Sequence, residues 1–366
     1  METKAIIYTI EMAIFVFLIY LFYRLSGKKN KINILDIVLI IILIVLTGIR
    51  YYVGSDYGSY LNTYKIFLQK EYTLFDLPSL AGTLGLNFSM WLASWLFGNN
   101  IYGIFWIISI MVYPLLIYTI RKQSINPSES FLLYCLLGYF AMSMNILKQI
   151  VAMTIILYAL HFLHEKKWIR FAFLSVIACL FHVATIIIIP LLILANYLKT
   201  TKKLFLISII ISVIAYLGYM IVPDILEIVP ALYERFILYF DGTYTYNIYG
   251  QIGGVIYFIF HIFMAILVMK YKDKLIKKDE KNRVYINLLL ISLPICAMSL
   301  QIRPINRLAF FLNQFLIFLI PSLIQCVEGE ARKRLARLIY FVIFIFFVVY
   351  TVFSRDNVYY QYITYL

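Results

Sequence analysis

Long apolar stretches recur along almost the whole chain, and this pattern restricts the fold more than any other feature. They lie at about 5–23, 33–49, 101–120, 130–147, 150–164, 204–222, 251–270, 284–302, 305–326 and 338–354. A helix needs about 20 apolar residues to cross a bilayer, and a spanning segment must satisfy its backbone groups internally. Of the 366 residues, 63% are hydrophobic and only 14% are charged. We therefore expect an all-α, polytopic integral membrane protein, with residues 1–366 in a single transmembrane domain.

Two regions do not read as simple spans. Residues 171–198 form an apolar run too long for one straight helix and interrupted by His182 and Pro190. We interpret this run as two short helices whose tip, near His182, faces outward. Residues 84–97 are too short for a span, so we expect a re-entrant or interfacial segment. Together these segments predict about 12 spans of roughly membrane-crossing length.

The formal charge of +14 reports topology rather than a polynucleotide partner, so no nucleic acid is expected. Most of the 32 lysines and arginines gather in short clusters between apolar runs, at 24–31, 121–122, 166–170, 199–203, 270–283 and 332–337. Short basic loops mark the cytoplasmic side, where they meet anionic lipid heads. The remaining basic residues then fall on the outer side, together with two outer loops at about 51–83 and 224–250.

Four of these outer cations lie at or beside the end of an apolar run: Arg50, Lys148, Arg303 and Arg307. Arginine and lysine suit phosphate, the first as a planar fork and the second as a compact charge. We therefore expect an anionic ligand on the outer side. The simpler alternative is that each cation snorkels to anchor a helix end.

Asp56 and His182 are the candidate general bases. Asp56 follows Arg50 across a glycine turn, so it either forms a local salt bridge or accepts a proton from a hydroxyl. His182 either fills space in an apolar run or serves as a base or phosphate donor at the outer surface. The neighbouring Tyr57 and Tyr60 suit a binding surface or an ordinary aromatic belt.

Several other chemistries lack sequence support. The outer carboxylates show no metal-ligand spacing, and no HExxH or glycine-rich nucleotide motif occurs, so neither a metal nor another cofactor is expected. The four cysteines stand singly in apolar runs, which indicates side-chain packing rather than disulfides.

Four segments carry a family resemblance. They are Gly48-x-Arg50-x-x-Val-Gly54-x-Asp56-Tyr57-x-x-Tyr60, Lys148-Gln149-x-x-Ala152, Ala178-x-x-Phe181-His182-x-Ala-Thr, and Arg307-Leu-Ala-Phe-Phe with Pro321. In this order and spacing the chain resembles the EpsG family of Wzy-type polysaccharide repeat-unit polymerases, over residues 35–325. Lys148 departs from the arginine that this family usually has, which keeps the charge but loses bidentate phosphate geometry.

The resemblance implies a GT-C-like or Wzy-like helical bundle, with short re-entrant or broken helices, in the bacterial plasma membrane. It also implies a glycosyltransferase that polymerises undecaprenyl-diphosphate-linked oligosaccharide repeat units into exopolysaccharide or capsule on the outer face. A chain-length regulator and a flippase would be its partners. The lipid diphosphate already stores the activation, so no cofactor is needed. The roles implied are a diphosphate clamp (Arg50, Lys148, Arg303, Arg307), a base (Asp56 or His182) and substrate contacts (Tyr57, Tyr60, Gln149).

Two other functions remain as alternatives. A flippase or transporter of the same lipid-linked sugars would have charges at mid-membrane and repeated halves, and no internal repeat is visible here. A membrane O-acetyltransferase would place histidine and arginine near the cytoplasmic face, whereas His182 is expected outside.

Overall fold

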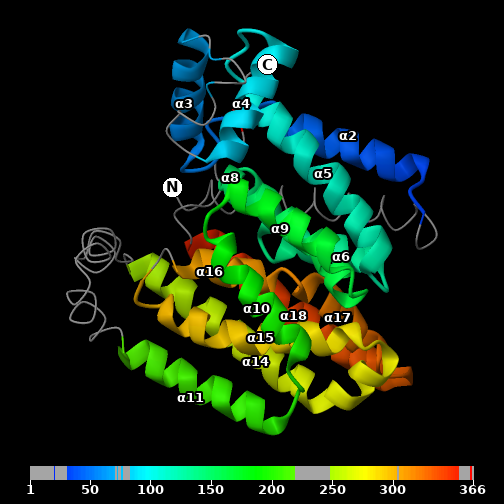
Figure 1. Cartoon of the computed structure of the whole chain (residues 1–366). Coiled ribbons are helices and arrows are strands. Elements are labelled where there is room, and N and C mark those ends of the chain that lie inside the picture. The colour runs from blue at the N-terminus through cyan, green and yellow to red at the C-terminus, as the bar shows by residue number, and fades with distance from the viewer. Residues whose placement is uncertain are drawn as a thin grey trace. The chain divides into compact units, whose positions relative to one another are not determined.

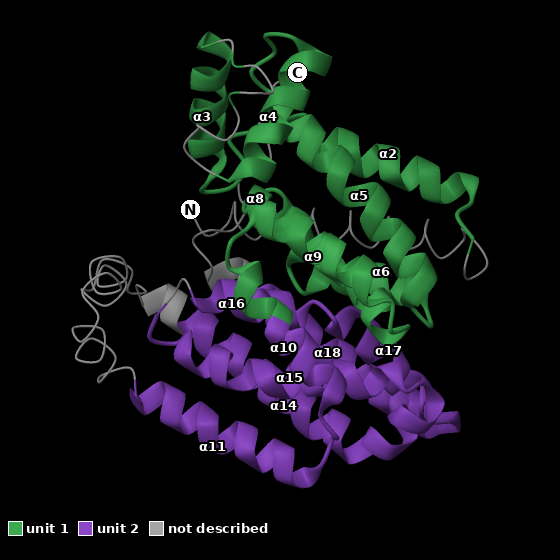
Figure 2. Cartoon of the chain, viewed as in Figure 1, with its two compact units in different colours: residues 1–189, 356–366 green, residues 190–355 purple. Residues whose placement is uncertain are grey.

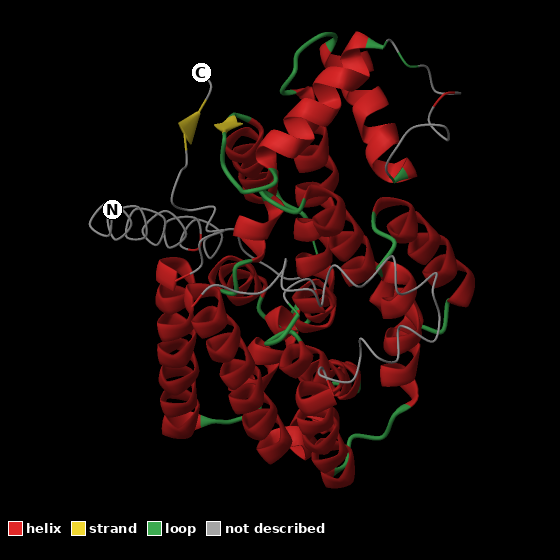
Figure 3. Cartoon of the chain, turned by 90° about the vertical axis from the view of Figure 1, so that its left-hand side faces the viewer, coloured by secondary structure: helices red, strands yellow, loops and turns green. Residues whose placement is uncertain are grey.

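Helices dominate the part of the chain that the computed structural model describes (Figures 1 and 3). The described residues are 20, 31–70, 72, 76, 83–218, 248–302, 305–353 and 363–364. They belong to two compact units, shown in Figure 2. Unit 1 comprises Met1–Ile189 with Asp356–Leu366, and unit 2 comprises Pro190–Arg355.

Unit 1 holds mostly helices of moderate length. In chain order they are α2 (Ile34–Gly48), α3 (Tyr57–Gln69), α4 (Leu84–Phe97), α5 (Gly103–Gln123), α6 (Pro127–Leu136), α7 (Tyr139–Ser143), α8 (Leu147–His164) and α9 (Trp168–Phe181), followed by α10 (Thr185–Tyr197), which continues into unit 2. A two-residue strand after α2, β1 (Arg50–Tyr51), pairs antiparallel with β2 (Ile363–Thr364) near the end of the chain.

Helices α2 and α5 lie antiparallel, and polar contacts fix both ends of the pair. Asn33 and Asp36 form a reciprocal capping box that starts α2. The Asp36 carboxylate also accepts three hydrogen bonds from Arg121 near the end of α5: Nε lies 2.9 Å from Oδ1 and 3.0 Å from Oδ2, and Nη2 lies 2.7 Å from Oδ1. At the opposite end the hydroxyls of Thr47 and Ser109 are 2.7 Å apart.

Helix α8 runs in the same direction as α5, and α9 returns along α8. Gln123 at the end of α5 donates to the carbonyl of Leu157 in the second half of α8, over 3.1 Å. After a short turn, Arg170 of α9 lies over the ring of Phe162, 5.7 Å from its centre. The first residues of α8, the last residues of α9 and the segment after α2 therefore share one end of unit 1.

Unit 2 contains the longest described helix, α14, and its helices are joined by buried polar contacts. They are α11 (Lys202–Gly218), α14 (Ile248–Lys278), α15 (Lys281–Met298), α16 (Asn306–Asn313), α17 (Leu316–Gln325) and α18 (Gly329–Phe353). The amide of Asn287 donates to the carbonyls of Ala195 and Leu198 at the end of α10. Asn313 donates to the hydroxyl of Tyr257 over 2.9 Å, which ties α16 to α14.

Three described helices are long and apolar enough to cross a membrane, Gly103–Gln123, Leu147–His164 and Ile252–Lys278. A fourth candidate is the pair α16 and α17, which is bent by 43°. The structure supports a helical membrane protein but not the expected 12 or so spans. The reason is that several apolar runs are broken: 130–147, for example, becomes α6 and α7, separated at Gly138, where φ is +87°.

Other expectations for the helices are confirmed. The run at 171–198 is two short helices, α9 and α10, that break at His182. The segment at 84–97 is a helix of 14 residues, shorter than a span. The four cysteines are free thiols. Most of the expected outer loop at 224–250 lies outside the described residues, whereas the loop at 51–83 contains α3.

Candidate functional site

Arg50 sits directly after α2, and its side chain turns into unit 1. The residue is only 1% exposed. Its guanidinium donates from Nη1 to the carbonyl of Thr47 and lies over the ring of Phe105, with Cζ 4.6 Å from the ring centre. An aromatic face attracts a cation at this distance. Arg50 therefore supplies a fixed, buried positive charge rather than an exposed one.

Tyr57 lies beside this charge, with its ring centre 6.0 Å from Arg50 Cζ. Tyr57 stacks on Phe105 with 4.3 Å between ring centres, and its hydroxyl donates to the carbonyl of Arg50 over 3.2 Å. Tyr51 and Tyr52 stand edge to face at 4.7 Å. Tyr57 is 1% exposed, whereas Tyr52 is 51% exposed. Tyr57 therefore belongs to the scaffold around Arg50, and Tyr52 presents its ring at the surface.

The glycine turn before Asp56 docks on the segment that precedes α8. Gly54 has φ of +100°, and a Cβ at this position would lie 3.0 Å from both Asn145 Oδ1 and the carbonyl oxygen of Met144. Asn145 Oδ1 accepts a bond from the backbone N–H of Asp56 over 2.9 Å. Only glycine combines this backbone conformation with so close an approach. The contact brings the Arg50–Asp56 segment to the start of α8.

Lys148 and Gln149 lie in the first turn of α8. Lys148 is partly exposed, and Gln149 is 2% exposed. The first N–H groups of a helix have no partner within the helix and carry positive potential, so this end favours an anion. Lys148 adds a full positive charge at the same place.

His182 ends α9, and its backbone N–H donates to the carbonyl of Ala178 over 3.0 Å. The side chain is half-buried. Because α9 runs antiparallel to α8, His182 lies at the same end of unit 1 as Lys148 and Asp56. The structure thus brings together Arg50, Asp56, Tyr57, Tyr60, Lys148, Gln149 and His182 at one end of one unit.

The remaining predicted cations belong to unit 2. Arg307 lies in the first turn of α16 and is exposed. Helix α16 begins at Asn306. Arg303 itself lies outside the described residues.

Two residues of this site were missed by sequence reasoning. Phe105 gives Arg50 its aromatic partner, and Asn145 holds the Gly54–Asp56 turn. Asn145 stands three positions before Lys148, and this position beside a candidate motif could have marked it as a site residue. Phe105 is one aromatic residue among many in an apolar run, and the sequence offers no signal for it.

The fold and this site define a class: a helical membrane protein with a buried arginine, a partly exposed lysine, a carboxylate and an imidazole at one end of a helix bundle. The EpsG family profile matches residues 33–366, nearly the whole chain, and the protein belongs to this family. Membership implies a membrane protein of the polysaccharide-polymerase type. No curated protein and no solved structure matches the chain significantly.

Proposed function

We propose that this protein is a multi-pass glycosyltransferase of the bacterial plasma membrane that polymerises undecaprenyl-diphosphate-linked oligosaccharide repeat units on the outer face, into exopolysaccharide or capsule. Membership of the EpsG family supports the polymerase class. The observation that carries the proposal for this site is the docking of the Arg50–Asp56 segment against the start of α8 through Asn145. A flippase and a chain-length regulator would work beside it.

The proposed reaction transfers the growing glycan from its lipid carrier to the next repeat unit. A hydroxyl oxygen of the acceptor sugar bonds to the anomeric carbon of the donor, and the bond from that carbon to the diphosphate oxygen breaks. Undecaprenyl diphosphate leaves with the electron pair, and the hydroxyl proton passes to a base. Asp56 and His182 are both candidates for this base.

The leaving diphosphate gains negative charge, which cations stabilise best when they are fixed in advance. Lys148 and the first turn of α8 are the proposed direct contacts, because Lys148 is partly exposed at a helix N-terminus. Arg50 is buried, so its proposed contribution is electrostatic and acts from beneath the site. The clamp roles of Arg303 and Arg307 are proposed from the family resemblance alone, and Tyr60, Gln149 and the buried Tyr57 are proposed to shape the sugar site.

The test is lipid-linked glycan analysis in a strain that lacks the protein, complemented in turn with the wild type and with single variants. Arg50→Ala and Lys148→Ala probe the two proposed clamp residues of unit 1. Arg307→Ala probes the proposed clamp residue in the described part of unit 2. Lys65→Ala is the matched control, because Lys65 is an exposed cation on α3 that has no proposed role. Each variant is checked for its level in the membrane.

We expect the deletion strain to accumulate single lipid-linked repeat units on the outer leaflet and to make no polymer. Lys65→Ala should restore the polymer, and Lys148→Ala and Arg50→Ala should not. Accumulation on the inner leaflet would identify a flippase instead. A full-length polymer that lacks only acetyl groups would identify an acetyltransferase, and either result would overturn the proposal.

A further inference from the structure

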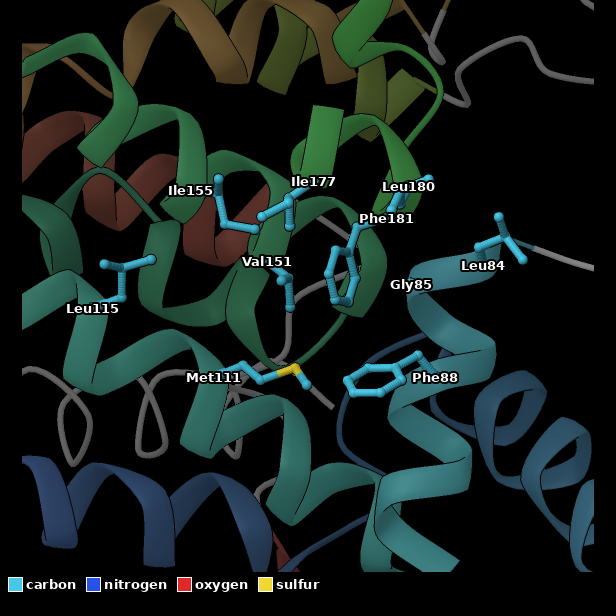
Figure 4. Close-up of a pocket in the computed structure, with 10 residues that line it drawn as sticks. All are labelled: Leu84, Gly85, Phe88, Met111, Leu115, Val151, Ile155, Ile177, Leu180 and Phe181. Carbon is cyan, nitrogen blue, oxygen red and sulfur yellow. The ribbon is translucent and has the colours of Figure 1, made fainter. Parts of the chain in front are cut away.

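An apolar groove of about 580 Å³ lies within unit 1, where α4, α5, α8 and α9 meet (Figure 4). Its walls consist of apolar side chains and one glycine. The residues that define it best are Phe88, Met111, Val151, Ile155, Ile177 and Phe181. Phe88 is 40% exposed and Leu180, on the rim, is 41% exposed, so the groove opens on the outside of unit 1.

Gly85 sets the shape of one wall. A Cβ at Gly85 would lie 2.6 Å from the ring of Phe181, so the ring rests against the backbone of α4. Figure 4 shows the Phe181 ring beside Gly85, and Met111 beside Phe88. The Phe181 ring therefore occupies the space that a side chain at position 85 would need.

The groove leads to the cationic end of the unit. Val151 and Ile155 line it from α8, and Lys148 precedes Val151 by three positions, which places all three on one face of the helix. Phe181 lines it from α9 and is followed at once by His182. On α5, Met111 comes six residues after Phe105, about 9 Å along the helix axis. The hydrocarbon surface therefore begins one helical turn from the Lys148 charge.

We infer that this groove binds the isoprenoid chain of a polyprenyl diphosphate, with the diphosphate at Lys148 and the start of α8. The inference rests on the proposed function and names the place of the carrier lipid in it. A wall without polar groups offers a sugar no hydrogen bonds, so the groove suits hydrocarbon. The positive charge at one end requires an anionic head on that hydrocarbon.

The volume also limits how much of the lipid fits. Sites of roughly 300–1,000 Å³ bury ligands of drug-like size, so the groove takes the few isoprene units next to the diphosphate. The rest of the chain leaves through the open side, past Phe88 and Leu180. An ordinary phospholipid acyl chain is the competing occupant, and the experiment separates the two.

The experiment is photo-crosslinking of the full-length protein in phospholipid nanodiscs. The first probe is undecaprenyl diphosphate with a diazirine on an isoprene unit near the head. The second is the matching polyprenol without the diphosphate, and the third is phosphatidylglycerol with a diazirine in an acyl chain. Labelled residues are mapped by peptide mass spectrometry.

Two adjacent positions on α9 give a matched pair of variants. Ile177→Trp fills the groove, whereas Val176→Trp adds the same ring to a neighbouring position that is 60% exposed and does not line the groove. Ile155→Phe fills the groove from α8 with less added bulk, in case Ile177→Trp does not fold. Thermal unfolding establishes that each variant is folded before it is labelled.

We expect the diphosphate probe to label groove residues, and Ile177→Trp or Ile155→Phe to reduce this labelling at least about tenfold while Val176→Trp changes it less than about twofold. Lys148→Ala should weaken labelling by the diphosphate probe about tenfold and leave the polyprenol unaffected. Equal labelling by phosphatidylglycerol, or unchanged labelling in both filled variants, would overturn the inference.

Failure here is distinct from failure of the proposed function, because labelling requires no sugar transfer. If the groove is not labelled but the deletion strain still accumulates single repeat units, the lipid binds elsewhere on a polymerase. If the groove is labelled but polymer formation does not depend on the protein, the lipid site stands and the polymerase proposal falls.

Discussion

The buried ion pair between Asp36 and Arg121 gives the sharpest prediction about the scaffold. The two residues are 0% and 2% exposed, and the carboxylate accepts three hydrogen bonds from the guanidinium. Removing one partner of such a pair leaves a buried charge uncompensated, which typically costs about 3–5 kcal/mol. We therefore expect Arg121→Met to lower the free energy of unfolding by about this amount.

The magnitude should differ between the two partners. Asp36 also accepts the bond from the backbone N–H of Asn33 in the capping box, and loss of a cap costs about 1 kcal/mol more. Asp36→Ala should therefore destabilise unit 1 by about 1 kcal/mol more than Arg121→Met. The double variant Asp36→Leu with Arg121→Met should recover most of the loss, because no unpaired charge remains.

The assay is equilibrium unfolding in mixed micelles, followed by tryptophan fluorescence. Lys31→Ala is the control, since Lys31 is an exposed cation at the same end of α2, and it should change the unfolding free energy by less than about 0.5 kcal/mol. A loss below about 1 kcal/mol for either single variant, or additive losses in the double variant, would refute the reasoning.

Three further predictions concern the site end and the opposite turn of unit 1. Gly54→Ala should reduce polymer formation and stability more than Gly98→Ala. Both glycines have positive φ, but a Cβ at Gly98 would meet no atom within 4 Å, whereas a Cβ at Gly54 would lie 3.0 Å from the Asn145 side chain. Complementation and thermal unfolding measure both. Asn145→Ala should remove the bond to the Asp56 N–H, worth about 1 kcal/mol, so polymer formation should fall with little change in unfolding temperature. At the turn after α8, the hydrogen bond from Lys167 holds the pKa of the Glu165 carboxyl below its usual range. The Glu165–Lys167 pair therefore stabilises the fold at pH values above the usual carboxyl pKa. This contribution is lost as the pH falls and the carboxyl is protonated. His161 also pairs with Glu165, at 2.9 Å, so unfolding against pH should show a larger loss for the wild type than for Lys167→Ala, and an identical profile for both would contradict it.

The positions of the helices could be predicted from the sequence to a large degree. Apolar runs at 101–120 and 150–164 correspond to α5 and α8, and the break at His182 follows from a run too long for one helix. The number of spans could not be predicted, because apolar length alone does not reveal a break such as the one at Gly138. Hydrophobicity indicates which segments are buried in protein or lipid, whereas the turns within such a segment depend on its local backbone geometry.

The charges near the helix ends show a second limit. Arg121 counted toward a basic cytoplasmic cluster in the sequence, yet in the structure it is buried against Asp36, 85 positions away in the chain. A pairing at such a distance leaves no local signal. The contact places the start of α2 and the end of α5 at the same end of the helix pair.

The candidate site combines two kinds of positive charge, and their difference bears on the proposed diphosphate ligand. Arg50 is held by the Thr47 carbonyl and the Phe105 ring, so its charge needs no rearrangement when a ligand arrives. Lys148 carries its charge on a flexible stem and can reach an anion of variable position. An arginine at position 148 would bind phosphate in a more rigid geometry. If the proposed function holds, a lysine there suits a site in which Arg50 already supplies a fixed charge and the diphosphate ligand changes position as each repeat unit is added.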